Sequence, residues 1–294
     1  MNTNTKNQLA EIGRQLDRGI FPEVKNGGLV SPGGTAVFPS ALGKEQVDES
    51  KRPRRSPAEP WAGSRTWQGA PGRTWPPGET APLVGADEGA PYEAELDAIR
   101  TAYPGAEVWR QEGGFWLFVE SAILPGLGRK AAFLVAVATE KRAVRSWAFW
   151  GGRVPGYSWI GPRHTNFPDG SICAFEPRDG TWAFGDSLVE LLDLYSVWAL
   201  RHVHYEVFGR WPGPQAVAYC YERLLELADN ELCGCGSTVH YAECCKNSDQ
   251  SRNRVAAAVQ FYILSSCAIR QPPPSIAPLL RDRERLPSIS SLVW

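Results

Sequence analysis

Residues 163–175 read Arg-His-Thr-Asn-Phe-Pro-Asp-Gly-Ser-Ile-Cys-Ala-Phe, and this stretch decides how the rest of the chain is interpreted. It places His164, Asn166 and Cys173 within ten residues, so an imidazole, an amide and a thiol can share one small pocket. A thiol is the most nucleophilic side chain near neutral pH, so it can accept an acyl group as a thioester and pass it to an amine. A side-chain amide can donate a hydrogen bond to the oxyanion that forms during such a transfer. Cys173 is therefore a candidate nucleophile, and Asn166 is a candidate oxyanion donor.

The sequence upstream of this stretch predicts a helix followed by an antiparallel meander. Residues 91–103 place Leu96, Ile99 and Tyr103 at helical spacing and end at Pro104-Gly105. Aromatic and β-branched residues then fill three runs that are separated by Pro/Gly or charged breaks, at 115–119, 131–139 and 144–150.

The sequence downstream predicts a tryptophan after a turn and then a long helix. Trp182 follows Asp179-Gly180-Thr181, and Ser187 and Glu190 have the spacing of a capping box. Gly209 and Pro212 are expected to end the helix. Its apolar stripe is formed by Leu188, Leu191, Leu192, Tyr195, Trp198 and Ala199.

The central stretch resembles the active-site flap of ubiquitin-conjugating enzymes, whose signature is His-Pro-Asn followed by Gly-x-Ile-Cys. Here the residues are His164-Thr165-Asn166 and then Gly170-Ser171-Ile172-Cys173, so Thr165 stands where the family usually has proline. The gap from Asn166 to Cys173 is one residue shorter than in common eukaryotic members. The resemblance covers roughly residues 89–212 and implies an α+β fold of the ubiquitin-conjugating-enzyme type, with a helix, an antiparallel meander, the active-site flap and further helices.

The same resemblance implies a function and partners. Cys173 would accept the C-terminal carbonyl of a ubiquitin-like modifier from an activating enzyme and pass it to an amine of a protein target. Asn166 would stabilise the oxyanion, and His164 would hold the shape of the flap rather than act as a base. Similarity to prokaryotic members implies a setting in bacterial anti-phage defence operons.

A second motif predicts a metal site. Cys233, Cys235, Cys244 and Cys245 place four thiols within thirteen residues, and the glycines after the first two allow a tight turn. Four thiolates at this spacing fit a closed, tetrahedral structural zinc site. The pattern resembles the zinc motif at the C-terminus of the SecA translocation ATPase. His240 lies within the loop but is not needed as a ligand, and the metal is expected to supply most of the folding energy of this short segment.

Composition limits the remaining classes of function. The chain has 294 residues, is 43% hydrophobic and carries a formal net charge of −1, so it has no global positive field that would attract nucleic acid. No segment resembles a signal peptide or is long enough to cross a bilayer, and four of the seven cysteines belong to the metal motif. We therefore expect a cytoplasmic protein that binds neither membranes nor nucleic acid.

The predicted domain organisation has four parts. Residues 1–88 contain 12 Gly and 10 Pro with little apolar periodicity, so we expect a largely disordered arm. Residues 89–228 form the conjugating-enzyme-like domain, and residues 229–249 form the zinc module. Residues 250–294 are expected to form a helix, with Val255, Val259, Tyr262 and Ile263 on one face, followed by a polar tail.

Two alternative functions remain open from the sequence. The first is a catalytically inactive adaptor with the same fold that uses its zinc module to bind a partner. The second, a Cys-His hydrolase, is less favoured because no separate acid that would orient His164 is evident. His202 and His204 do not share a helical face, which favours ordinary packing over a metal pair. The other thiols, Cys220 and Cys267, belong to no pattern.

Overall fold

The computed structural model describes residues 3–25, 28–30, 92–121, 130–151, 157–175, 181–264, 270–276 and 286–292. Contacts divide the chain into one unit of Met1–Ala41 with Ala90–Trp294, and a second unit of Leu42–Gly89. The second unit lies outside the described residues, as does most of the predicted N-terminal arm. All elements described below belong to the first unit.

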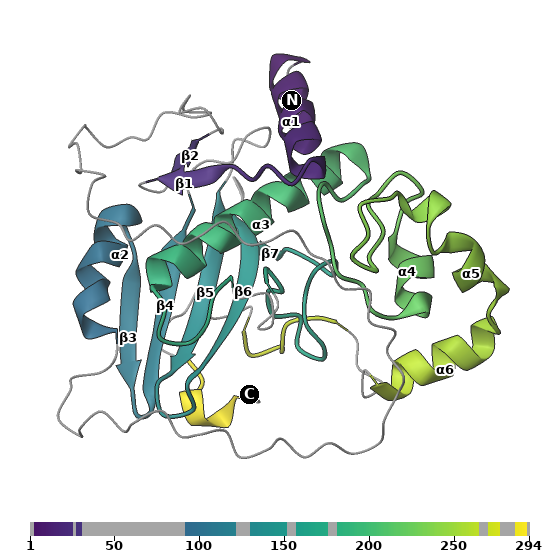
Figure 1. Ribbon diagram of the computed structural model, residues 1–294. Coiled ribbons are helices and arrows are strands. Elements are labelled where there is room, and N and C mark those ends of the chain that lie inside the picture. Colours follow the sequence, from purple (N-terminus) through teal and green to yellow (C-terminus); the bar gives the residue numbers. More distant parts are fainter. Residues whose placement is uncertain are drawn as a thin grey trace. The chain divides into compact units, whose positions relative to one another are not determined.

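The described part of the first unit is a mixed α+β structure built on a five-stranded antiparallel sheet (Figure 1). The strands are hydrogen-bonded in chain order: β3 (Glu107–Gln111), β4 (Gly114–Glu120), β5 (Ala131–Ala138), β6 (Ala143–Gly151) and β7 (Tyr157–Trp159). The meander predicted from three runs is confirmed as β4, β5 and β6, and the structure adds an edge strand on each side. Every residue of β5 is buried, so both faces of the sheet are covered.

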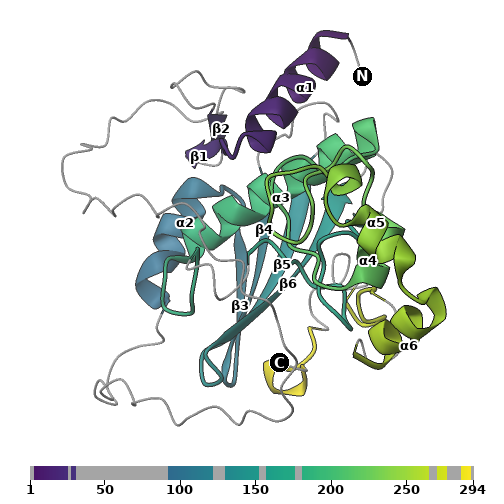
Figure 2. The same ribbon diagram turned by 45° about the vertical axis from the view of Figure 1, so that its right-hand side comes forward.

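Helix α3 (Leu188–Phe208) lies across one face of the sheet, together with α2 (Leu96–Ala102) (Figures 1 and 2). The Ser187 side chain accepts a hydrogen bond from the amide of Val189, and Gly209 ends the helix in a left-handed conformation with φ 68°. The Leu188 amide donates to the Glu95 carboxylate at 2.7 Å. The acid that caps this helix is therefore supplied by the segment before α2, whereas the sequence pattern pointed to Glu190.

The opposite face of the sheet is covered by the C-terminal segments. Trp116 and Trp147 are buried on this face together with Ile276 and Ile289, the latter in the short helix η6 (Ile289–Ser291). The Trp116 indole donates to the carbonyl of Pro287 at 3.0 Å. In residues 270–276 and 286–292, where the sequence predicts a polar tail, the structure buries these two isoleucines. Two isolated isoleucines give no periodic signal, and only the apolar face of the sheet shows where they are buried.

The prediction of disorder is wrong for residues 3–25. Helix α1 (Thr3–Asp17) packs on α3 and buries Leu9 and Leu16 completely, and the hairpin of β1 (Glu23–Lys25) and β2 (Gly28–Val30) follows it. Asp17 forms an ion pair with Arg210 and accepts a hydrogen bond from the amide of Gly213 at 2.8 Å. The weak apolar pattern of α1 becomes significant only because α3 presents an apolar surface to it.

Leu16→Ala is expected to lower the free energy of unfolding by about 2–5 kcal/mol, because it leaves a cavity between α1 and α3. Chemical denaturation followed by tryptophan fluorescence measures this change. Ile20→Ala is the matched control, because Ile20 is 40% exposed and its truncation removes little buried surface. A Leu16→Ala protein as stable as the wild type would show that α1 does not pack on the domain in solution.

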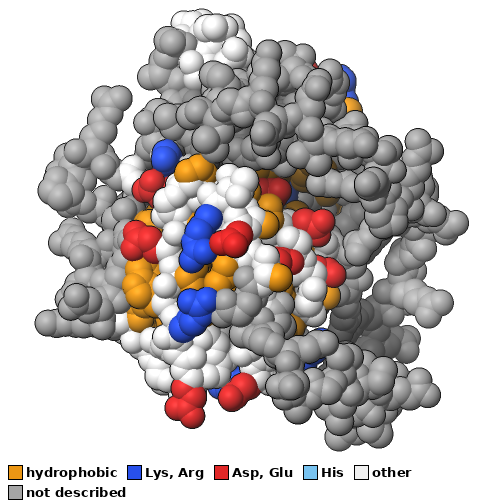
Figure 3. Space-filling view, turned by 90° about the vertical axis from the view of Figure 1, so that its left-hand side faces the viewer, with side chains coloured by type: hydrophobic (Ala, Val, Ile, Leu, Met, Phe, Trp, Pro, Cys, Tyr) orange, Lys and Arg blue, Asp and Glu red, His pale blue; other side chains and the backbone are white. Residues whose placement is uncertain are grey.

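The side of the molecule that carries α2 and β3 has a mixed surface. Figure 3 shows acidic and basic side chains interspersed over its described part, without a large patch of either sign. Among the described helices, none combines the length and the apolar content that crossing a bilayer requires.

Candidate active-site flap and metal centre

Residues 163–173, called the flap below, form a hairpin-like loop. Thr165 and Ile172 pair as an antiparallel bridge, and the Asn166 amide donates to the Ser171 carbonyl at 2.7 Å. The amide of Cys173 donates to the carbonyl of His164 at 3.0 Å. The fold thus brings together the two ends of the motif that the sequence separates by nine positions.

The flap is attached to the sheet through β6. The Ile172 amide donates to the carbonyl of Ser146 at 2.7 Å. Asp169 accepts a hydrogen bond from Arg145 at 2.7 Å through its carboxylate and one from the indole of Trp147 at 2.9 Å through its carbonyl. All three partners lie on β6, so this strand holds the loop that carries Cys173.

His164 holds the flap to α3 through its backbone. Its φ of 49° is left-handed, which is uncommon for a residue with a side chain. Its carbonyl accepts hydrogen bonds both from the amide of Cys173 and, at 2.9 Å, from the indole of Trp198 in α3. One backbone oxygen therefore links the long helix to the cysteine.

The imidazole of His164 is engaged in packing and in one hydrogen bond. The ring stacks on Trp211 with centroids 4.0 Å apart, and Nε2 lies 3.1 Å from Gln215 Oε1. A carbonyl oxygen only accepts, so Nε2 carries the proton and Nδ1 does not. Burial, together with the nearby Arg201 and Arg163, lowers the pKa of His164 well below its ordinary value. The ring is neutral near pH 7 and is held in place as part of the support of the flap.

Asn166 is exposed at the turn of the flap, and its side-chain amide is directed back onto the loop. Nδ2 donates to the carbonyl of Ile172 at 2.9 Å and to the hydroxyl of Ser171 at 3.3 Å. In this arrangement the amide stabilises the turn that precedes Cys173. It would have to leave these acceptors to donate to an oxyanion.

Cys173 is partly buried. Burial raises the pKa of Tyr195 in α3, and the charge of Cys173 acts in the same direction. Burial lowers the pKa of Arg270 to about 10, and the charge of Cys173 opposes this shift. The pKa values of Tyr195 and Arg270 thus both respond to charge on Cys173. Sequence reasoning assigned Tyr195 only to the apolar stripe and missed Arg270, which is 97 positions away and carries no motif.

A buried charge network connects the flap to the metal segment. Arg163 donates to both carboxylate oxygens of Glu231, at 2.8 and 2.5 Å, and the side chains are 3% and 0% exposed. Burial by itself would lower the pKa of Arg163, but the hydrogen bonds and charge of Glu231 outweigh it and raise the pKa. Glu231 also accepts hydrogen bonds from the Trp211 amide at 2.8 Å and from Gln215 at 3.0 Å. The side-chain oxygen of Gln215 in turn forms a hydrogen bond with Nε2 of His164. Glu231, just before Cys233, is thus connected to the flap.

The four predicted metal ligands form one cluster. The sulfur atoms of Cys233, Cys235, Cys244 and Cys245 all lie within 4.8 Å of one another. The Cys235–Cys244 and Cys244–Cys245 sulfur pairs are 3.6 and 3.8 Å apart, too far for disulfides. A tetrahedral site with Zn–S bonds of about 2.3 Å requires sulfur atoms about 3.8 Å apart. The cluster could hold a metal ion, and its dimensions are compatible with zinc.

The loop conformation explains the two glycines of the motif. Gly236 has a φ of 89°, and a Cβ on Gly234 would lie 2.6 Å from Cβ of Val217. His240 lies outside the sulfur cluster and pairs through its backbone with Leu232. The glycines thus allow the close turns that bring the two cysteine pairs together.

The elements that pack around the sulfur cluster begin before residue 229. Helix α4 (Cys220–Glu226) contacts α5 (Lys246–Ser251), and Arg223 donates to both carboxylate oxygens of Asp249 at 2.8 and 2.6 Å. Tyr241, in the short helix η3 (Tyr241–Glu243), donates to the same carboxylate at 3.2 Å. The metal segment and α4 therefore form one packed module.

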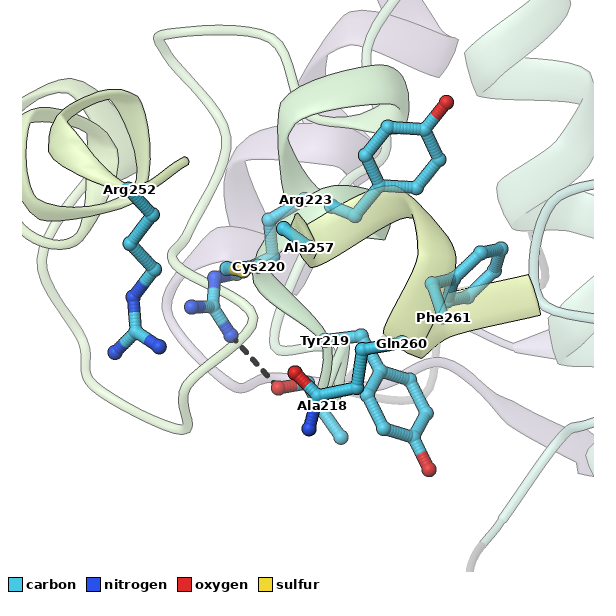
Figure 4. Close-up of a pocket in the computed structure, with 9 residues that line it drawn as sticks. Ala218, Tyr219, Cys220, Arg223, Arg252, Ala257, Gln260 and Phe261 are labelled. Atoms are coloured by element: carbon cyan, nitrogen blue, oxygen red, sulfur yellow. Dashed lines mark hydrogen bonds between the residues drawn. The ribbon is translucent and has the colours of Figure 1, made fainter. Parts of the chain in front are cut away.

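A small cavity lies between α4 and α6 (Arg254–Leu264) (Figure 4). It has a volume of about 180 Å³, and its lining includes Cys220, Arg223 and Phe261 but no flap residue. Arg223 donates to the carbonyl of Ala218, another lining residue, at 3.0 Å. Cys220 is thus a lining residue of this cavity, and Cys267 lies outside the described residues.

The two histidines of α3 are buried packing residues. The ring of His202 packs between those of Trp198 and Trp211, and burial lowers its pKa to about 3. His204 Nδ1 lies 3.2 Å from the carbonyl of Arg210. Neither belongs to the sulfur cluster.

Comparison of the chain with protein-family models, curated proteins and solved structures finds no match. The functional argument therefore rests on the geometry of the flap and on the order of the elements around it.

Proposed function

We propose that this protein is a ubiquitin-conjugating-like acyl transferase that carries a ubiquitin-like modifier as a thioester on Cys173. The observation that carries the proposal is the flap itself: the Cys173 amide donates to the carbonyl of His164, and the Asn166 side chain donates to the carbonyl of Ile172, the residue before Cys173. The order of α2, the meander, the flap, Trp182 and α3 is the order expected of a ubiquitin-conjugating-enzyme-like fold.

The reaction would have two steps at Cys173. In the first, the Sγ thiolate attacks the thioester carbonyl on an activating enzyme, so that a new S–C bond forms and the thiolate of the activating enzyme leaves. In the second, a target amine attacks the same carbonyl, an N–C bond forms, the S–C bond to Cys173 breaks and the amine proton passes to water. Asn166 would donate to the oxyanion of the second step, after its amide turns away from Ile172.

A structural zinc ion held by Cys233, Cys235, Cys244 and Cys245 belongs to the same proposal. The ion would have a structural role, because four thiolates complete a tetrahedral shell and leave no open position for substrate. The module would then present Glu231 to Arg163 in the base of the flap.

The test is a charging assay with the matching activating enzyme, nucleotide and modifier. Wild-type protein should give an adduct that is lost on adding a reducing thiol, because thioesters exchange with thiols. Cys173→Ala should abolish the adduct, and Cys220→Ser is the control for a thiol outside the flap. Asn166→Ala should still accept the modifier but pass it to an amine about 100-fold more slowly, as expected for loss of one oxyanion donor.

A catalytically inactive adaptor with the same fold is the second candidate. It is favoured by the resting position of the Asn166 amide, which is hydrogen-bonded within the turn. An adaptor would retain its activity in its pathway after Cys173→Ala. Failure of a correctly paired activating enzyme to charge Cys173 would overturn the conjugation proposal in favour of the adaptor.

A further inference from the structure

Arg270 reaches the flap from the C-terminal segment. Its guanidinium lies over the ring of Phe167 at 4.2 Å from the centroid, and its side chain is only 11% exposed. The next residue, Gln271, packs so closely on Gly170 that a Cβ there would lie 2.9 Å from the Gln271 carbonyl carbon. Two adjacent residues of this segment therefore contact the loop that carries Cys173.

Two carboxylates of α4 hold Arg270. It forms ion pairs with Glu222 and, at 2.8 Å, with Glu226. Glu226 is also 3.9 Å from Nε of Arg163 at the base of the flap. The position of the guanidinium is thus fixed by α4 and the aromatic ring of the flap together.

One N–H donor of Arg270 is not used by these ion pairs. Its Nε atom is buried and has no hydrogen-bond partner among the described residues. A buried donor without a partner is costly unless an acceptor reaches it. Burial lowers the pKa of the guanidinium to about 10 and the charge of Cys173 opposes this shift, so Arg270 remains cationic at neutral pH.

We propose that Arg270 stabilises negative charge at Cys173, first on the thiolate and then on the oxyanion formed during acyl transfer, with Glu222 and Glu226 as its positioning residues. This inference rests on the proposed function, because it assigns a residue to the same reaction. A nearby cation favours a thiolate over a thiol, and a fixed donor favours the charged tetrahedral intermediate. The other ionisable groups around the site include Arg163, His164 and Asp169 on the flap and Tyr195 on α3, and burial raises the pKa of Glu226 to about 7.

The experiment measures alkylation of Cys173 by iodoacetamide between pH 6 and pH 10, quantified on the flap peptide by mass spectrometry. Arg270→Met should raise the apparent pKa of the thiol by about one unit or more, and so slow alkylation near neutral pH about tenfold. Arg270→Lys should restore most of the rate because it restores the charge. Arg252→Met is the matched control, because Arg252 lines the separate cavity between α4 and α6.

A second set of variants separates the cation from its partners. Removal of Arg270 leaves Glu222 and Glu226 unpaired, and their charges alone would also disfavour the thiolate. The triple variant Arg270→Met, Glu222→Gln, Glu226→Gln removes all three charges and should still alkylate more slowly than Glu222→Gln, Glu226→Gln. Equal rates in these two proteins would overturn the proposal even if Arg270→Met were too unstable to study.

The same assay distinguishes this inference from the proposed function. Alkylation requires no activating enzyme, so slower alkylation in Arg270→Met supports the effect of Arg270 on the thiolate whether or not a modifier is transferred. Wild-type alkylation in Arg270→Met, with intact charging of Cys173, would refute the role of Arg270 and leave conjugation standing.

Discussion

Glu231→Gln is expected to lower the free energy of unfolding by about 3–5 kcal/mol, the usual cost of leaving one member of a buried ion pair without its partner. Arg163 is 3% exposed and donates two hydrogen bonds to this carboxylate, so its buried charge would keep only the more distant Glu226, 3.9 Å from its Nε atom. A glutamine at position 231 would also present amide hydrogens to a site that already receives donors from Trp211 and Gln215.

Denaturant unfolding of the variant and the wild type measures this loss. Asp229→Asn is the control, because its ion pair with Lys246 is largely exposed, with Asp229 63% and Lys246 29% accessible. Loss of an exposed pair should cost about 1 kcal/mol or less. Equal, small effects of the two substitutions would show that the Arg163–Glu231 pair does not form in solution.

Removal of the metal is expected to unfold the module around α4 and α5 and to loosen the flap. Zinc bound by thiolates contributes about 10–16 kcal/mol in small zinc-dependent folds, far more than the apolar contacts of such a segment. Glu231 and Leu232 immediately precede the first ligand, and both are bonded to Gln215, which meets His164. Loss of order at Cys233 should therefore spread to the flap.

Elemental analysis should find one zinc ion per chain, and none after all four cluster cysteines are replaced by serine. Hydrogen–deuterium exchange should show faster exchange in residues 163–173 of the metal-free protein, whereas β4 and β5 keep their protection. Cys220→Ser, outside the cluster, should retain both the metal and the protection. Absence of stoichiometric zinc would refute the metal assignment, and an unchanged flap without zinc would refute the coupling.

The sequence by itself determined the elements whose signals are local. Strands β4, β5 and β6 follow from runs of β-branched and aromatic residues, and α3 follows from its apolar stripe, its Ser187 cap and its terminal Gly209. The sulfur cluster was predicted because its four cysteines lie within one short loop. In each case the residues that specify the element are neighbours in the chain.

The tertiary structure alone decided the contacts between distant segments. Leu16 of α1 and Ile289 of the C-terminal segment are buried only because α3 and the sheet offer them apolar surfaces. Glu231, just before the first cluster cysteine, contacts Arg163, and Arg270, after the cluster, contacts Phe167. Such pairings leave no periodicity in the sequence, since their free energy depends on burial and charge compensation that exist only after the sheet, α3 and the module have packed.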